Sequence, residues 1–114
     1  MIAAVMGAGA WGTAFAATLA DAGTPARLWT RGAELLARLE TGVNPIYLPG
    51  VTLPPVVRPT TDPYAALAGA DLVVLALPAQ TLRDNLGAWG PAIPADALVL
   101  SLAKGIELGT AQRM

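Results

Sequence analysis

Three glycines near the amino end of the chain have the spacing of a phosphate-binding turn. Gly7, Gly9 and Gly12 form a Gly-x-Gly-x-x-Gly run between an apolar segment and a helix-like one, where a dinucleotide fingerprint must lie in order to work. The first glycine permits a tight bend, the second lets the backbone approach a pyrophosphate, and the third lets the helix sit against the strand. The helix start then offers unpaired N–H groups to the anion. We predict dinucleotide binding; the alternative is a tight turn without a ligand.

Arg31 follows the second apolar segment, at the place that separates NAD from NADP. A carboxylate there would accept a hydrogen bond from the ribose 2′-hydroxyl of NAD, but the chain has Thr30 and Arg31, and the nearest acid is Glu34. Because an arginine can pair with a 2′-phosphate, we predict that NADP is at least tolerated and leave the preference open. The alternative is a solvated arginine, with Glu34 only favouring the start of a helix.

Lys104 is the only lysine of the chain and follows the last predicted strand. Ligands of open α/β sheets bind outside the carboxyl ends of the strands. A cation at that edge could hold a phosphate or polarise a carbonyl oxygen. Taken alone, a lysine in such a loop is more often only exposed to solvent.

Short apolar runs alternate with helix-like stretches, and Gly and Pro separate them, as in βαβ chains. The sequence predicts strands over 2–6, 26–30, 56–58, 72–77 and 97–102, and helices over 11–22, 33–40, 63–68 and 80–89. The run over 72–77 does not alternate, which indicates cover on both faces as in a parallel sheet. The predicted fold is α/β: a doubly wound, mostly parallel Rossmann sheet with helices on both faces.

Two further local patterns predict structure. Asp62 followed by Pro63 is typical of an N-cap and a first helical position. Prolines at four positions predict that Thr41–Pro55 is a long loop without regular structure. In a small domain, a loop of this length is more often functional than not.

Composition excludes several classes of protein. The chain has 114 residues, 54% of them hydrophobic and 13% charged, so we expect one folded domain and no disordered segment. It has no Cys and no His, so we predict no disulfide and no metal site. A net charge of −1 gives no basic surface for nucleic acid. The first 20 residues are uncharged, but they contain three glycines and lack flanking Lys or Arg, so we expect neither membrane insertion nor a signal peptide.

Four segments together resemble the N-terminal domain of bacterial NAD(P)-dependent glycerol-3-phosphate dehydrogenase. Their order and spacing match over nearly the whole chain, which is more specific than any single motif. The segments are Gly7–Ala14, Asn44–Gly50, Leu77–Ala79 and Lys104–Glu107.

The resemblance implies roles for individual residues. It implies that the cofactor phosphates are cradled by Gly7, Gly9, Ala10, Trp11 and Gly12. It also implies that Arg31 contacts the adenosine end, that Tyr47 and Pro78 lie near the cofactor, and that Lys104 touches both cofactor and substrate. From the residues alone, Trp11 would be a core residue at a helix start, Tyr47 a loop aromatic with its hydroxyl in water, and Pro78 the end of a strand.

The resemblance further implies an activity. Family members reduce dihydroxyacetone phosphate to sn-glycerol 3-phosphate for phospholipid synthesis in the cytoplasm. They are much longer than this chain, and a helical second domain supplies the lysine thought to act as general acid. We expect the position of that lysine to lie beyond Met114, so we assign no catalytic residue within 1–114. The expectation is an incomplete Rossmann domain that binds cofactor with little or no turnover.

Two other functions and one assembly state stay open. The alternatives are a dinucleotide-binding module without catalysis, and another Rossmann reductase acting on a hydroxy acid or an acyl-CoA. The Asn44–Gly50 segment, taken with Lys104 and Gly105, separates the second alternative from the main prediction. Apolar surface left uncovered would favour a homodimer or aggregation.

Overall fold

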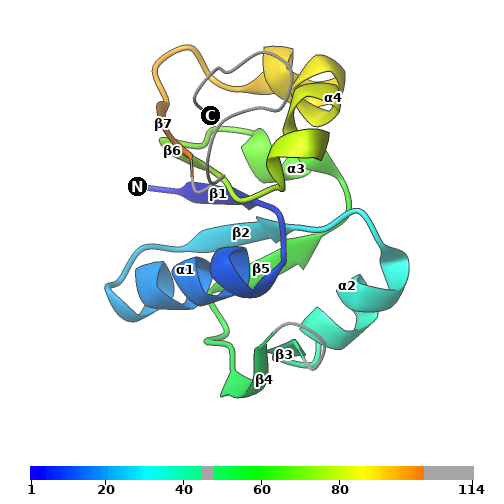
Figure 1. Ribbon diagram of the computed structural model, residues 1–114. Helices are drawn as coiled ribbons and strands as arrows, with labels where there is room; N and C mark the ends of the chain where they lie inside the picture. The colour runs from blue at the N-terminus through cyan, green and yellow to red at the C-terminus, as the bar shows by residue number, and fades with distance from the viewer. Residues whose placement is uncertain (45–47, 102–114) are drawn as a thin grey trace.

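The computed structural model describes residues 1–44 and 48–101 (Figure 1). Its elements follow one another in the order of a βαβ chain, with a small hairpin inserted after the second helix. They are β1 (Ala3–Met6), α1 (Ala10–Asp21), β2 (Ala26–Trp29), α2 (Ala33–Leu39), β3 (Val43–Asn44), β4 (Leu48–Thr52), β5 (Val57–Thr60), α3 (Pro63–Leu67), β6 (Leu72–Leu75), α4 (Ala79–Trp89), the 3₁₀ helix η1 (Gly90–Ala92) and β7 (Leu98–Ser101).

Five parallel strands form the main sheet, in the order β5-β2-β1-β6-β7. The chain first builds outward from β1 to β2 and β5, then crosses back to place β6 on the other side of β1. This strand order is that of a doubly wound Rossmann sheet, and it confirms the predicted fold class. The order reverses between β1 and β6, so the crevice at their carboxyl ends is the place where such sheets bind ligands.

Helices cover both faces of the sheet (Figure 1). On one face, Ala16 and Ala20 of α1 and Leu39 of α2 pack with the strand residues of a first apolar cluster. On the other face, Leu67 of α3 and Leu82 of α4 belong to a second cluster. Because each central strand is covered on both sides, β1 is buried along its whole length and Val73, Val74 and Leu75 of β6 are buried as well. The absence of alternation in this segment predicted that burial correctly.

Helix α3 is capped at both ends. The Asp62 carboxylate accepts a hydrogen bond from the Tyr64 N–H (3.0 Å), and Pro63 occupies the first helical position, as the sequence predicts. At the other end, the guanidinium of Arg27 on β2 donates to the carbonyl oxygens of Ala65 and Ala66 (both 3.1 Å), and to that of Ala68. A cation at the carbonyl end of a helix also complements its dipole, so Arg27 ties α3 to the sheet.

The prediction of a loop without regular structure over Thr41–Pro55 is wrong in part. β3 and β4 form a two-stranded antiparallel sheet within it, with Val43 opposite Thr52 and Asn44 opposite Leu48. Pro49 belongs to β4 and lies between its paired residues Leu48 and Thr52, so it has no described pairing partner in that ladder. A short edge strand tolerates proline for this reason.

The other predicted boundaries agree with the structure or differ from it by one or two residues. β5 begins at Val57 rather than residue 56 and continues through Pro59 to Thr60, which an edge strand also permits. β6 stops at Leu75, two residues before the predicted end.

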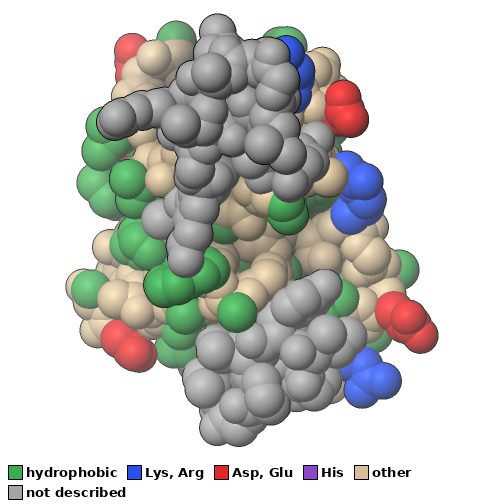
Figure 2. Space-filling view, viewed as in Figure 1, with side chains coloured by type: hydrophobic (Ala, Val, Ile, Leu, Met, Phe, Trp, Pro, Cys, Tyr) green, Lys and Arg blue, Asp and Glu red, His purple; other side chains and the backbone are tan. Residues whose placement is uncertain are grey.

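The opposite edge strand, β7, carries three consecutive apolar side chains with large exposed fractions. These are Leu98 (69%), Val99 (46%) and Leu100 (40%). The expectation of uncovered apolar surface is met at this strand, whereas the homodimer remains a prediction. On the face seen in Figure 2, charged side chains of both signs lie scattered around the rim and gather in no patch.

Candidate functional site

The turn between β1 and α1 lies beside the crevice where the strand order reverses. The Gly7 N–H donates to the Trp29 carbonyl at the end of β2 (3.1 Å), and the Ala76 N–H beyond β6 donates to the Met6 carbonyl at the end of β1 (3.0 Å). The turn is therefore fixed to the strands on both of its sides. This fixes the position of the backbone that follows it.

Gly7 and Gly12 leave no room for a side chain. Gly7 has a φ of +126°, and a Cβ there would lie 2.6 Å from the Ala76 carbonyl oxygen. A Cβ on Gly12 would lie 1.9 Å from the carbonyl oxygen of Gly7. The buried hydroxyl of Thr13 donates to the Ala8 carbonyl (3.1 Å) and holds the helix on the turn. The tight bend and the close helix approach that the glycine spacing predicts are both present.

Gly9 differs from the other two glycines. Its φ of −71° and ψ of −172° are open to any residue, and apart from its chain neighbours no atom of the described residues lies within 4 Å of the place that a Cβ would take. Neither the backbone conformation nor the packing of this domain requires glycine there. Gly9 is also the N-cap residue of α1, where no side chain of the described residues forms a cap hydrogen bond and no acidic residue lies in the first turn. The space beside Gly9 and the positive dipole end of α1 fit an anionic group of a dinucleotide.

Ala10 and Trp11 open helix α1, and both are exposed, with Trp11 at 65%. The interpretation of Trp11 as a core residue, made from the residues alone, is therefore wrong. Small side chains make the contact of α1 with the sheet, so the large indole stays at the surface beside the glycine turn. The buried positions of α1 are Gly12, Thr13, Ala16 and Ala20.

Arg31 lies just beyond the end of β2, and its side chain reaches helix α4. Its Nη2 donates to Oδ1 of Asn85 at 2.8 Å. Glu34 is exposed in the first turn of α2, where a carboxylate favours the helix dipole. The end of β2 thus presents a cation to the crevice, and the first acid comes only within the next helix.

Pro78 lies beyond the end of β6 as the N-cap residue of α4. Its carbonyl accepts the N–H groups of Thr81 and Leu82 (both 3.0 Å), so it begins the helix on the same edge as the glycine turn. The structure therefore brings the glycine run, Arg31 and Pro78 to one edge of the sheet.

The remaining predictions about site residues fall outside residues 1–44 and 48–101. Tyr47 and Lys104 belong to the parts of the chain that the structure does not describe, and so does Met114. The proximity of Tyr47 to the cofactor and the double contact of Lys104 therefore stay predictions. The same holds for the general-acid lysine that we expect beyond Met114.

Asn85 is a polar residue of this edge that the sequence analysis did not single out. It is 4% exposed and lies on the inner side of α4 together with the buried Leu82 and Trp89. The signal available in the sequence was an amide on the apolar face of a predicted helix. A buried polar side chain needs hydrogen-bond partners, and the partner 54 residues earlier becomes visible only in the folded chain.

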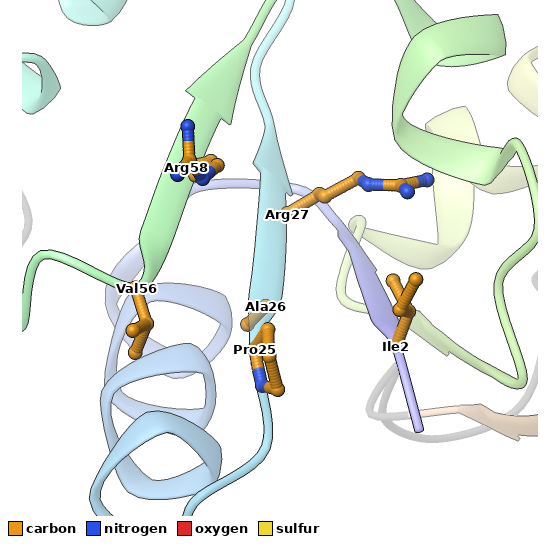
Figure 3. Close-up of a pocket in the computed structure, with 6 residues that line it drawn as sticks. All are labelled: Ile2, Pro25, Ala26, Arg27, Val56 and Arg58. Atoms are coloured by element: carbon orange, nitrogen blue, oxygen red, sulfur yellow. The ribbon is translucent and has the colours of Figure 1, made fainter.

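A hollow of about 230 Å³ lies at the opposite end of the sheet, near the amino ends of β1, β2 and β5. Figure 3 shows that the Arg27 side chain extends from β2 away from Arg58 on β5. The Arg27 guanidinium already donates hydrogen bonds to carbonyl groups at the end of α3. Because ligands of such sheets bind at the carboxyl ends of the strands, we assign this hollow no part in the candidate site. The residues that line it are Ile2, Pro25, Ala26, Arg27, Val56 and Arg58.

The described part of the chain holds neither a metal centre nor a membrane-spanning helix. Within residues 1–44 and 48–101, no three His, Cys, Asp or Glu side chains come together in a way that could hold a metal ion. None of the helices in those two ranges has the length and apolar character needed to cross a membrane.

Comparison with protein families matches residues 2–114 to the NAD-dependent glycerol-3-phosphate dehydrogenase N-terminus. The chain is 56% identical over 112 residues to glycerol-3-phosphate dehydrogenase (NAD(P)+) 2 of Mycobacterium tuberculosis. It is 55% identical over 113 residues to glycerol-3-phosphate dehydrogenase (NAD(P)+) of Streptomyces avermitilis. These alignments cover 97% and 98% of this chain but 34% of each relative. The chain therefore spans about a third of the length of the curated relatives that it matches.

Solved structures share the fold. The crystal structure of glycerol-3-phosphate dehydrogenase from Coxiella burnetii superposes with a TM-score of 0.86 at 31% identity, covering 95% of this chain and 33% of that one. A ketopantoate reductase family structure from Ralstonia eutropha gives a TM-score of 0.74 at 30% identity, covering 94% of this chain and 35% of that one.

Proposed function

Because this chain belongs to the NAD-dependent glycerol-3-phosphate dehydrogenase family, whose N-terminal domain it matches, we propose that it binds NAD or NADP at the carboxyl edge of its parallel sheet. In this proposal the domain serves an enzyme that reduces dihydroxyacetone phosphate to sn-glycerol 3-phosphate for phospholipid synthesis. The proposal includes a cytoplasmic location, which follows from the family resemblance.

The glycine at position 9 is the observation that carries the proposal. Gly7 and Gly12 are explained by the fold itself, because a Cβ at either would collide with backbone atoms. Gly9 has an ordinary φ and, among the described residues, open space around it, so neither backbone strain nor packing gives a reason for the missing side chain. Close approach of a pyrophosphate to the backbone gives that reason. The start of α1 supplies N–H donors and a positive dipole end beside it.

The other residues divide between the two ends of the dinucleotide. Gly7, Ala10, Trp11 and Gly12 would shape the cradle around the pyrophosphate. Arg31 would meet the adenosine ribose, and its charge would favour a 2′-phosphate. Tyr47 and Pro78 would line the cofactor, and Lys104 would contact both the cofactor and the substrate. When bound, the reduced nicotinamide supplies the hydride, and the domain contributes orientation and fixed charge.

We further propose that the 114-residue chain binds cofactor with little or no turnover. A ketone that accepts hydride also needs a proton donor within hydrogen-bond reach of its oxygen. In the relatives, about two thirds of the sequence lies outside the segment that this chain matches. The family resemblance assigns the general-acid lysine and most of the substrate site to that remainder, at positions beyond Met114.

Fluorescence titration with NADH and NADPH tests the binding site. Gly9→Val places a branched side chain where the pyrophosphate must lie, so binding should be abolished while the protein stays folded. Exchanging a favourable N-cap residue for an unfavourable one costs about 0.5 to 2 kcal/mol of stability. Gly87→Ala is the matched control, since that glycine also has open space around it but lies near the far end of α4. Gly12→Ala should instead destabilise the fold by about 1 to 3 kcal/mol or more through overpacking.

Two results decide the outcome. Unchanged affinity in folded Gly9→Val would refute the pyrophosphate assignment. A turnover assay with dihydroxyacetone phosphate and NADH or NADPH then separates the functions. Saturable binding of the nucleotide without its oxidation supports a binding domain. Oxidation of NADH or NADPH with a hydroxy-acid precursor such as ketopantoate, but not with dihydroxyacetone phosphate, would favour the alternative reductase. A ketopantoate reductase family structure shares the fold of this chain.

A further inference from the structure

Asn85 of helix α4 forms two short hydrogen bonds, one within the helix and one to Arg31 beyond the end of β2. Its Oδ1 accepts Nη2 of Arg31, and its Nδ2 donates to the carbonyl of Thr81, both at 2.8 Å. The side chain is 4% exposed, so solvent cannot readily replace either partner. A buried amide with both of its ends bonded in this way has one orientation and holds it.

The bond to Thr81 determines which end of the amide faces Arg31. A carbonyl oxygen can only accept, so the NH₂ group of Asn85 turns toward it and Oδ1 turns outward. Oδ1 then meets Nη2 of the guanidinium, a group that can only donate. The arrangement leaves no ambiguity about the amide orientation. Helix α4 therefore aims a single acceptor at the arginine beyond β2.

Asn85 orients Arg31 without neutralising it. Among the described residues, no carboxylate forms an ion pair with Arg31, and its hydrogen-bond partner is the neutral amide. A carboxylate at position 85 would hold the guanidinium equally well, but it would offset the positive charge and repel a phosphate nearby. An amide keeps the full charge available to an anion, and a held side chain loses less freedom when it binds.

We infer that Asn85 is a positioning residue for NADP recognition: it holds Arg31 at the carboxyl edge of the sheet, charged and oriented for the 2′-phosphate of the adenosine ribose. This inference rests on the proposed function and deepens it, because the glycine turn serves NAD and NADP equally and only the ribose end separates them. The signature of this role is a loss of NADPH affinity that NADH does not share.

The test is a double-mutant cycle on the 114-residue chain, with dissociation constants for NADPH and NADH from fluorescence titration. Asn85→Ala should raise the dissociation constant for NADPH by about five- to tenfold and that for NADH by less than about twofold. Asn85→Asp should weaken NADPH at least as much, because it adds a negative charge at the same place. In an Arg31→Ala background, Asn85→Ala should leave both constants unchanged, because the residue acts through the arginine. Asp84→Ala, an exposed neighbour on α4, is the control.

A second measurement does not depend on the nucleotide. The guanidinium N–H signals of Arg31 in ¹⁵N NMR should be protected from exchange in the wild type and lose that protection in Asn85→Ala, while the far-ultraviolet circular dichroism stays the same. An unchanged ratio of the two dissociation constants in both folded Asn85 variants would overturn the inference alone. This outcome includes an equal weakening of NADPH and NADH binding. Absence of saturable binding of either nucleotide to the wild type would overturn the proposed function and the inference with it.

Discussion

Two buried tryptophans give a stability test that is independent of any ligand. Trp29 on β2 and Trp89 at the end of α4 are 5% and 2% exposed. Their rings meet edge to face, with centroids 5.8 Å apart and planes at 65°. The indole N–H of Trp29 donates to the Thr61 carbonyl (3.0 Å), whereas the buried indole N–H of Trp89 has no hydrogen-bond acceptor among the described residues. The same substitution at the two sites should therefore have unequal effects.

The expected difference follows from hydrogen bonding. Trp→Phe removes the same atoms at both positions, so the loss of apolar contact cancels in the comparison. Trp29→Phe gives up a net hydrogen bond worth about 0.5 to 1.5 kcal/mol, and Trp89→Phe removes an unpaired donor whose burial costs about 1 to 3 kcal/mol. Trp29→Phe should thus be less stable than Trp89→Phe by about 1.5 to 4.5 kcal/mol.

Urea unfolding followed by far-ultraviolet circular dichroism measures both free energies without relying on tryptophan fluorescence. Equal destabilisation in the two single variants, or a greater loss in Trp89→Phe, would refute the assignment of a paired and an unpaired donor.

Two further predictions concern cofactor selectivity and self-association. Arg31→Ala should weaken the binding of NADPH more than that of NADH, by about 1 to 3 kcal/mol in fluorescence titrations. Arg58→Ala, on β5 at the other end of the sheet, should change the binding of neither. Equal losses of affinity for both cofactors would refute a role of Arg31 in selectivity. The exposed apolar residues of β7 should make the chain self-associate at high concentration. Leu98→Lys should shift the sedimentation coefficient toward that of a monomer, because a charge on an exposed edge strand opposes pairing. A wild-type chain that sediments as a monomer at high concentration would contradict this prediction.

Local patterns predicted the parts of the fold that depend on local chemistry. The unbroken apolar run of β6 indicated both its strand and its burial, because a strand covered on two faces needs no polar side. Asp62 and Pro63 indicated the start of α3, since both act within a single helical turn. The glycine spacing predicted the bend at Gly7 and the close contact at Gly12 in the same way.

The features that sequence patterns missed depend on contacts between distant segments or on what a neighbour leaves uncovered. Trp11 is exposed because small residues of α1 meet the sheet, which the size of the indole alone could not indicate. The β3–β4 hairpin forms in spite of Pro49 because that proline lies between the paired positions. The contact of Asn85 with Arg31 joins residues 54 positions apart, and no local periodicity encodes such a pair.

The locked bend at Gly7 has a kinetic consequence. Its backbone is bonded to the end of β2, and the start of α1 rests against its carbonyl too closely to admit even a methyl group. The fold thus fixes the bend, and we expect it to need no rearrangement when a nucleotide arrives. Association at this point should proceed in one step, with an observed rate that rises linearly with nucleotide concentration and shows no plateau from a slow rearrangement.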